Sequence, residues 1–220
     1  MIHLLKLPLK KSIFIIFLVL LIDQCVKFWV KTNMYLGEEH HILGNWFIIH
    51  FTENEGMAFG MMLPGIYGKL LLTTFRLVVA AGGSWYLFKL IREGAHTGLV
   101  ISGSLILAGA LGNIIDSTFY GKLFSESDHQ LALLLPEQGG YAGLLYGRVV
   151  DMLYFPILQG HFPSWFPFWA NEDFIFFRPI FNIADSSITI GVAIIILFQK
   201  KFFPEKAKSE IQEPQEDSTK

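Results

Sequence analysis

Four stretches of this chain are long and apolar enough to cross a lipid bilayer, and they constrain the fold more than any other feature. A helix needs about 20 predominantly apolar residues to cross a bilayer. Such windows run over about 12–30, 67–91, 98–115 and 180–198. With 52% hydrophobic and only 16% charged residues, the chain is richer in apolar side chains than a soluble domain requires. We therefore predict an all-α membrane protein with four transmembrane helices. A small extracytoplasmic β-like flap or cradle and an enlarged periplasmic loop between the third and fourth helices are expected to complete it.

Basic residues indicate how these helices are oriented in the membrane. Most of them gather on one side of the windows, against few on the other: Lys6, Lys10, Lys11, Lys89, Arg92, Lys200, Lys201, Lys206 and Lys208. Because such residues collect in cytoplasmic segments, both chain termini are expected in the cytoplasm. The loops over about 31–66 and 116–179 then face the other side. Residues 1–203 form one membrane domain in this interpretation, and residues 204–220 form a disordered cytoplasmic tail.

The N-terminal window also allows a rival interpretation, in which residues 1–25 are a cleaved signal peptide. A basic start precedes a short apolar run, as signal peptides require. Asp23 and Gln24, however, are bulky and polar where a cleavage site needs small residues. Three further windows follow, which favours a span that is retained.

Among the ionisable side chains inside or at the ends of the windows, the candidates for a function are Asp23, Lys27, Arg76, Asp116 and Asp185. Each costs roughly 2.5–3.5 kcal/mol at the bilayer centre on insertion scales, so each is a candidate functional residue. Asp23 and Lys27 are four residues apart and can pair on one helix face. A structural ion pair and a role in contacting substrate both remain open for them. For Arg76 we predict an acidic or carbonyl partner inside the helix bundle.

Two Asn to Asp pairs recur at a spacing of three residues. Asn182 and Asp185 share a face if a helix has begun there, and an asparagine can orient a carboxylate by hydrogen bonding. Asn113 and Asp116 repeat the spacing at the outer end of the third window, where helix capping is the alternative role. Asp151 follows two valines, a pattern that favours a short extended segment returning towards the membrane. From its local sequence alone, Asp151 resembles an ordinary loop acid.

The chemistry available on the outer face consists mainly of carboxylates. No HExxH sequence is present, and the seven histidines form no pair at metal-ligand helical spacing, so no metal site is expected. Two carboxylates held close together share a proton and can activate water against an amide. No basic patch typical of nucleic-acid binding lies outside the tail, so that class is set aside.

Two other functions are compatible with the same residues. A non-enzymatic membrane transporter or assembly factor could use Asp23, Lys27, Arg76 and Asp185 as an ionic relay. A hydrolase acting on lipid-linked phosphates would require clustered basic residues on the outer face, and these are scarce.

Five motifs in order along the chain resemble the lipoprotein signal peptidase family, also called signal peptidase II. They are Asp23 to Lys27, Asn54 to Gly60, Gly109 to Asp116, Val149 to Asp151, and Phe181 to Asp185. Each motif is weak by itself, whereas five in order on four predicted spans are specific. The resemblance covers residues 12–198.

This resemblance implies an aspartic endopeptidase with Asp151 and Asp185 as its catalytic pair. It implies substrate-binding or bracing roles for Asp23, Lys27, Asn54, Gly56, Asn113, Asp116 and Asn182. The implied reaction removes the signal peptide from a prolipoprotein, before a cysteine that carries diacylglycerol. No cofactor is implied. The expected partners are these substrates and membrane lipids, with a monomeric enzyme in the bacterial inner membrane and an active site near its periplasmic face.

For the segments that lie outside the membrane, the sequence allows more than one structure. Alternating apolar residues over 46–59 suit a strand-like flap that bends at Gly56 and Gly60, with a plain interfacial loop as the alternative. Ser117 stands where the family usually has Arg, and Arg148 is a candidate substitute. The long segments 117–147 and 156–179 are expected to form either a periplasmic platform or simple surface elaboration.

Overall fold

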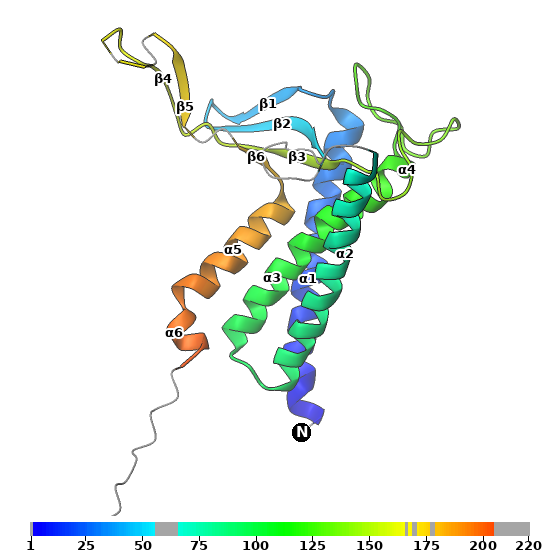
Figure 1. Cartoon of the computed structure of the whole chain (residues 1–220), viewed down its shortest axis with the longest axis vertical. Helices are drawn as coiled ribbons and strands as arrows, with labels where there is room; N and C mark the ends of the chain where they lie inside the picture. The colour runs from blue at the N-terminus through cyan, green and yellow to red at the C-terminus, as the bar shows by residue number, and fades with distance from the viewer. Residues whose placement is uncertain (1, 56–65, 166, 169–170, 177–178, 205–220) are drawn as a thin grey trace, which may run out of the picture.

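The computed structural model describes residues 2–55, 66–165, 167–168, 171–176 and 179–204 (Figure 1). Its long helices are α1 (Ile2–Asn33), α2 (Ile66–Arg92), α3 (Thr97–Ile115) and α5 (Ile183–Leu197). A π-helical segment (Asp116–Tyr120) and α4 (Gly121–Leu123) continue α3, and α6 (Gln199–Phe202) follows α5. The strands are β1 (Glu39–Leu43), β2 (Phe47–Asn54), β3 (Val149–Tyr154), β4 (Leu158–His161), β5 (Asp173–Phe176) and β6 (Ile180–Phe181). Helices form the lower part of the molecule and strands the upper part (Figure 1).

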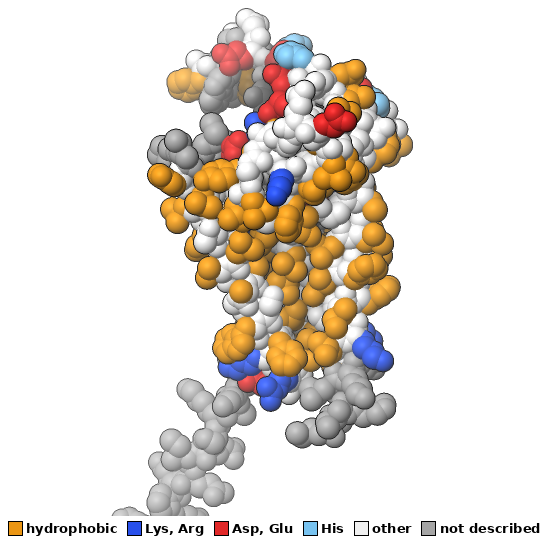
Figure 2. Space-filling view, turned by 90° about the vertical axis from the view of Figure 1, so that its right-hand side faces the viewer, with side chains coloured by type: hydrophobic (Ala, Val, Ile, Leu, Met, Phe, Trp, Pro, Cys, Tyr) orange, Lys and Arg blue, Asp and Glu red, His pale blue; other side chains and the backbone are white. Residues whose placement is uncertain are grey.

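The helical part has the surface of a membrane protein. Hydrophobic side chains cover its sides, while Lys and Arg gather at the lower end and most visible acids lie at the upper end (Figure 2). Large apolar side chains such as Phe14, Phe75 and Leu197 are exposed along the helices. In water this exposure would be unfavourable, because contact between apolar surface and water raises the free energy. Soluble proteins therefore rarely expose apolar patches of this size. Lipid is therefore the environment that fits these helices.

Three of the four predicted windows correspond to helices long enough to cross a bilayer: Pro8–Asn33, Tyr67–Arg92 and Thr97–Leu123. The fourth prediction, 180–198, began too early. Ile180 and Phe181 pair with β3 instead of entering the helix. Asn182 then caps α5, which has 15 residues. At about 1.5 Å per residue, such a helix spans roughly 22 Å of a hydrocarbon core about 30 Å thick.

Glycines allow α3 and α5 to pack closely. A Cβ atom on Gly112 would lie 2.7 Å from Asp23 Oδ2 and 3.0 Å from the Ala184 side chain. On α5, a Cβ atom on Gly191 would lie 2.7 Å from the Ser102 carbonyl oxygen. Larger side chains would separate the helices, and van der Waals packing is the main attraction between helices in lipid. This contact fixes the start of α5 beside α1 and α3.

A four-stranded antiparallel sheet lies across the upper ends of the helices, in the order β1-β2-β3-β6 (Figure 1). The expectation of a strand-like segment after 46 is confirmed for β2, and the extended segment at Asp151 is confirmed as β3. Gly56 to Gly60, the proposed bend of the flap, lie outside the described residues. The predicted small β-like flap or cradle is thus present as a sheet, which β1 and β6 also join, and β4 pairs with β5.

The sheet brings distant segments to the head of α5. In β3, Asp151 lies opposite Thr52 of β2, and Leu153 lies opposite Phe181 of β6. The chain therefore leaves β3, forms the projecting β4–β5 hairpin, and returns antiparallel through β6. Asn182 follows β6 directly, so the hydrogen bonding of the sheet aligns it with Asp151.

The predicted loop at 116–179 is partly folded against the core. The π-helical segment and α4 extend the third helix to Leu123, beyond its predicted end at 115. Tyr120, Phe124 and Ala132 are buried with Val30 of α1 and Val150 of β3 in one hydrophobic cluster. Apolar burial of this kind stabilises the attachment of the segment to the sheet and to α1. Much of residues 117–147 is thus an integral support, and the described part of residues 156–179 includes the exposed hairpin.

Candidate active site

A buried lysine connects α1 to α3 directly below the sheet. Lys27 Nζ lies 2.9 Å from Asp23 Oδ2 and 2.8 Å from Asp116 Oδ2, and it donates to Asn113 Oδ1 at 2.9 Å. The predicted Asp23–Lys27 pair is therefore present, with Asp116 as a second anionic partner. All three charged side chains are inaccessible to solvent. Buried charges of this kind persist only when they are paired and hydrogen-bonded.

Asp23 and Asp116 extend this cluster to the start of α5 and to β3. Asp23 Oδ1 accepts a hydrogen bond from the Ala184 backbone N–H at 2.9 Å. A carboxylate suits this position because the first N–H groups of a helix have no partner within the helix and carry partial positive charge. Asp116 Oδ2 accepts from the Val150 backbone N–H at 3.2 Å. Both acids thus hold the backbone beside the predicted catalytic pair.

Asn182 and Asp185 form a capping box at the start of α5. Asn182 Oδ1 accepts from the Asp185 backbone N–H at 2.9 Å, and the Asp185 carboxylate accepts from the Asn182 backbone N–H at 3.4 Å. The predicted partnership is present, but it runs through the backbone and not between the two side chains. Such reciprocal capping fixes the first turn of the helix.

Two asparagine side chains connect Asp151 to Asp185. Asn182 Nδ2 donates to Asp151 Oδ1 at 2.7 Å and to Asn113 Oδ1 at 3.0 Å. Asn113 Nδ2 then donates to Asp185 Oδ1 at 2.7 Å. Asn54 Nδ2 donates to the other oxygen of Asp151 at 3.2 Å. The structure therefore joins five of the predicted site residues in one hydrogen-bonded network.

The environment of Asp151 favours a protonated carboxyl group. Its burial, and next the neighbouring charge of Asp185, raise the pKa of Asp151 to about 7. Hydrogen bonds from Asn54 and Asn182, together with the charge of Lys27, oppose this increase. An acid with a pKa near neutrality beside a second carboxylate can hold the single proton that such a pair shares.

Arg76 lies near acidic residues of the site, as the sequence predicted, but one of its donors is left without a described partner. Its Nη1 is buried and has no hydrogen-bond partner within the described part of the chain. The guanidinium interacts electrostatically with Asp185 and Asp151, yet it forms no ion pair with either of them among the described contacts. The predicted acidic partners are therefore present as electrostatic neighbours, while Nη1 itself makes no hydrogen bond to a described residue.

Arg148, the candidate substitute for the family Arg at Ser117, lies in an ionic cluster at the outer side of the sheet. Its Nη1 is 2.8 Å from Glu53 Oε2 and 2.6 Å from Glu126 Oε1. Ser117 is fully buried, and its hydroxyl has no hydrogen-bond partner among the described residues. Arg148 thus acts at the outer side of the sheet, where it connects β2 to segment 117–147.

Sequence reasoning missed this outer ionic cluster, which consists of Lys31, Glu53, Glu126, Ser127 and Arg148. Lys31 Nζ pairs with Glu53 and donates to Ser127 Oγ at 2.7 Å. Burial would raise the pKa of Glu53, but the charges of Lys31 and Arg148 hold it below its usual value. The spacing of Lys31, four residues after Lys27, was the signal that could have placed it on the same helix face.

Gln24 was also missed as a site residue. Its side-chain amide donates to Asp116 Oδ1 at 2.9 Å and to Asp23 Oδ2 at 3.1 Å. Its carbonyl oxygen accepts from the Tyr120 hydroxyl at 3.2 Å. Because Gln24 lies next to Asp23 in the first motif, its polarity inside a span was the available signal.

The chemistry of this arrangement is that of a carboxylate pair supported by neutral amides. Within the described residues, no group of three or more His, Cys, Asp or Glu side chains is placed to hold a metal ion. Amide donors orient the two carboxylates without adding charge. A pair that shares one proton can act as general base and general acid on a water molecule and an amide.

Comparisons with known proteins identify the family of this chain. The family model for Signal peptidase (SPase) II matches residues 15–201. The lipoprotein signal peptidase of Porphyromonas gingivalis is 51% identical over 184 residues, which cover 83% of this chain and 80% of the relative. The lipoprotein signal peptidase of Amoebophilus asiaticus is 39% identical over 183 residues, covering 82% and 73%.

Solved structures support the same assignment. A bacterial membrane enzyme determined by the in meso method at 2.3 Å resolution has a TM-score of 0.57 and 27% identity, covering 90% of this chain and 93% of that one. Another, at 1.9 Å resolution, also has a TM-score of 0.57, with 28% identity and coverage of 88% and 95%. On the strength of the family match and the extent of identity, the chain belongs to the signal peptidase II family and is a membrane aspartic peptidase.

Proposed function

We propose that this chain is the endopeptidase that removes the signal peptide from diacylglyceryl-modified prolipoproteins, cleaving before the lipidated cysteine. Membership of the signal peptidase II family supports this activity. The observation that carries the assignment to particular residues is the network Asp151–Asn182–Asn113–Asp185. It brings two carboxylates from β3 and α5 to one place at the outer end of the helices.

In the reaction that we propose, Asp151 starts protonated and Asp185 starts ionised. Asp185 takes a proton from water, the resulting hydroxide attacks the scissile carbonyl carbon, and Asp151 gives its proton to the carbonyl oxygen. The proton held by Asp185 then passes to the amide nitrogen as the C–N bond breaks, and Asp151 recovers a proton from the intermediate. The raised pKa of Asp151 supports this assignment of roles.

The remaining site residues brace this pair. Asn54, Asn113 and Asn182 hold the carboxylate oxygens in place by hydrogen bonds. Asp23 and Asp116 fix the backbone around them, since they accept from the start of α5 and from β3, and Lys27 pairs with both acids. Their contribution is positional, because a displacement of about 1 Å at a catalytic group can cost roughly 100-fold in rate. Gly56 is proposed for the substrate flap and lies outside the described residues.

The proposed topology has four crossings, with α5 and α6 together as the fourth. Basic residues at the lower end of the helices support cytoplasmic termini and a periplasmic active site in the bacterial inner membrane (Figure 2). Residues 1–203 form the single membrane domain in this proposal, and residues 204–220, of which only Pro204 is described, follow as a cytoplasmic tail. The enzyme acts as a monomer in contact with membrane lipids.

Replacement of either acid tests the proposed activity. Asp151→Asn and Asp185→Asn should each lower the rate of prolipoprotein processing by at least about 1000-fold, because a neutral amide can neither accept nor supply the required proton. The measurement is a mobility-shift assay of a diacylglyceryl-modified prolipoprotein with purified enzyme in detergent. Asp128→Asn, at an exposed acid of the outer segment, is the matched control and should process at the normal rate. Normal processing by either dyad variant would reject the assignment.

A further inference from the structure

Helix α2 presents a polar face towards the site. Lys69, Thr73 and Arg76 recur at a spacing of four and three residues, which places them on one side of the helix. Lys69 Nζ donates to the Glu55 carbonyl oxygen at 2.5 Å, and Thr73 Oγ1 donates to the Leu145 carbonyl oxygen at 3.0 Å. Glu55 directly follows Asn54, whose side chain contacts Asp151. The face that carries Arg76 is therefore directed towards the sheet and the dyad.

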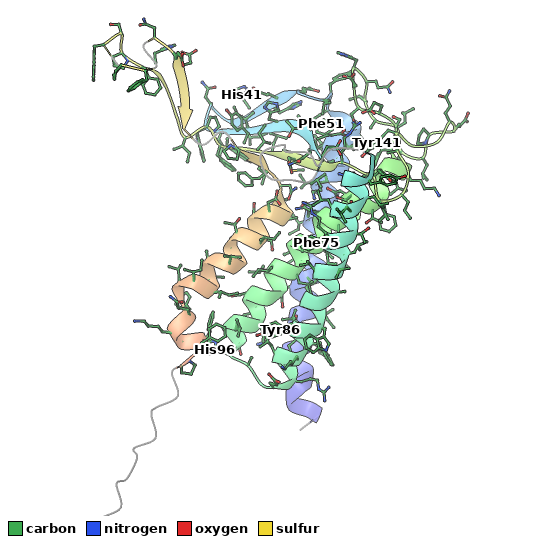
Figure 3. All side chains as sticks on the ribbon, in the orientation of Figure 1. His41, Phe51, Phe75, Tyr86, His96 and Tyr141 are labelled. Carbon is green, nitrogen blue, oxygen red and sulfur yellow. The ribbon has the colours of Figure 1, made fainter. Side chains whose placement is uncertain are left out.

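The adjoining side of α2 at the same level faces lipid. Phe75, labelled in Figure 3, is 62% exposed, as expected for a side chain on the outer surface of the bundle. Arg76, the next residue, is only half-buried as a whole, but its Nη1 is fully enclosed. A charged arginine at this depth is unfavourable in contact with lipid, so its side chain is expected to have a function inside the helix bundle.

Arg76 combines an unpaired donor with proximity to both acids. Among the described residues, Nη1 has no hydrogen-bond partner, although the charge of the guanidinium acts on Asp185 and Asp151. A buried donor without a partner is unfavourable, and more so when the group is charged. By contrast, Lys27 and Lys31 both have anionic partners. Of these three cations, Arg76 is therefore the one with a buried donor that no described residue accepts from.

We propose that Arg76 contacts the substrate and donates a hydrogen bond from Nη1 to a backbone carbonyl oxygen next to the scissile amide. This inference rests on the proposed function. A backbone carbonyl is an acceptor that every prolipoprotein offers at the cleavage site, whatever its side chains. Binding of the substrate would satisfy the donor, so part of the cost of burying it is recovered when the complex forms. The planar guanidinium also holds an acceptor in a defined direction, which a lysine ammonium does less well.

The central experiment compares Arg76→Met and Arg76→Lys with the unaltered full-length enzyme in detergent, using a diacylglyceryl-modified prolipoprotein. Loss of one positioned donor typically costs about 100-fold to 1000-fold, so Arg76→Met should lower kcat/KM by about 100-fold. Arg76→Lys should recover to within about tenfold of the unaltered enzyme. Arg92→Met, at the cytoplasmic end of the same helix, is the matched control and should stay within about twofold.

Two further measurements separate substrate contact from a structural role. The thermal midpoint of Arg76→Met should not fall, because the variant removes an unpaired buried charge. Its pH–rate profile should shift to higher pH, because a positive charge near the dyad has been removed while Lys27 and Asp185 still act on Asp151. In an Asp185→Asn background, which should not turn over, Arg76→Met should weaken binding of the same prolipoprotein by about tenfold.

The outcomes distinguish this inference from the proposed function. If Asp185→Asn is inactive while Arg76→Met keeps kcat/KM within about threefold, the role of Arg76 is rejected and the dyad stands. A loss of activity in Arg76→Met that comes with a lower thermal midpoint, an unchanged pH profile and unchanged binding would also reject it. If Asp185→Asn itself processes normally, the proposed function fails first.

Discussion

Helix α1 buries two lysines one turn apart, and they serve different parts of the molecule. Lys27 and Lys31 are both inaccessible to solvent. Lys27 contacts two aspartates and Asn113, all of which also bond to the start of α5, to β3 or to Asp185. Lys31 instead pairs with Glu53 and lies 4.9–5.9 Å from the ring centroids of three aromatic residues: Phe51, Phe124 and Tyr141.

The difference shows that burial of a charge does not by itself identify a catalytic site. The partners of Lys27 are polar groups that hold the dyad, so its loss should affect both stability and catalysis. The partners of Lys31 belong to β2 and to segment 117–147; Phe51 and Tyr141 lie at the outer end of the molecule in Figure 3. Lys31 therefore stabilises the support of the site, and its charge is further from the reaction.

The largest effect is expected from Lys27→Met. The substitution leaves Asp23 and Asp116 buried without their cation, and breaking a buried pair in this way typically costs about 3–5 kcal/mol. The free energy of unfolding in detergent should fall by that amount, and prolipoprotein processing should be lost. Lys10→Met, at an exposed lysine of the same helix, should change neither. A stable and active Lys27→Met enzyme would remove the distinction between the two lysines.

Lys31→Met should have a smaller effect on stability and little effect on the reaction. Glu53 keeps its contact with Arg148 at 2.8 Å, so it is not left unpaired. A methionine side chain can also occupy the space between the three aromatic rings that surround Lys31. We expect a loss of about 2 kcal/mol in unfolding free energy, with kcat within about threefold. Chemical denaturation and the mobility-shift assay measure the two quantities. A large decrease in kcat without destabilisation would show that the outer ionic cluster acts on the dyad.

The pH dependence should originate from the dyad. Because the pKa of Asp151 is raised from 3.8 to about 7, its proton is bound more tightly in the folded protein than in the unfolded chain. Its contribution to stability is therefore fully present below about pH 4 and is lost as pH rises through about 7. The rate should fall about tenfold per pH unit above that value, because ionised Asp151 cannot act as an acid. A pH–rate profile that stays flat well above neutrality would contradict this.

The smallest effect is expected from Glu126→Gln in the outer ionic cluster. Glu126 is 39% exposed and Arg148 is 31% exposed, so their pair is partly screened by solvent. Such pairs contribute less than about 1 kcal/mol, and Arg148 keeps Glu53. Unfolding free energy should fall by no more than that amount, with unchanged processing. A loss of several kcal/mol would mean that this cluster is as tightly coupled as the one around Lys27.

Sequence patterns predicted the helices well because each pattern is local. Long apolar windows gave α1, α2 and α3, and the spacing of Asp23 and Lys27 gave their ion pair. The same reasoning extended the fourth window into Ile180 and Phe181, since apolar residues fit a strand as well as a helix. Only the pairing of those two residues with β3 decided between the two structures.

The site was recognised from its motifs but could not be assembled from them. The resemblance named Asp151 and Asp185, yet nothing near Asp151 in the sequence distinguishes it from a loop acid. Lys31, Gln24 and Arg148 were missed or misplaced because their partners lie 22 to 96 residues away along the chain. Contacts over such distances depend on how the sheet and the helices meet, which spacing does not encode.

The sequence by itself determined that this chain lies in a membrane, and through its motifs which family it belongs to. Both properties follow from local features, namely apolar length and short ordered patterns. The tertiary structure alone decided that Asn182 joins Asp151 to Asn113 and Asp185, and that Arg76 keeps a donor free of described partners. The reason is that the antiparallel pairing of β3 with β6 and the close packing of α3 on α5 bring these groups together, and both depend on residues far apart in the chain.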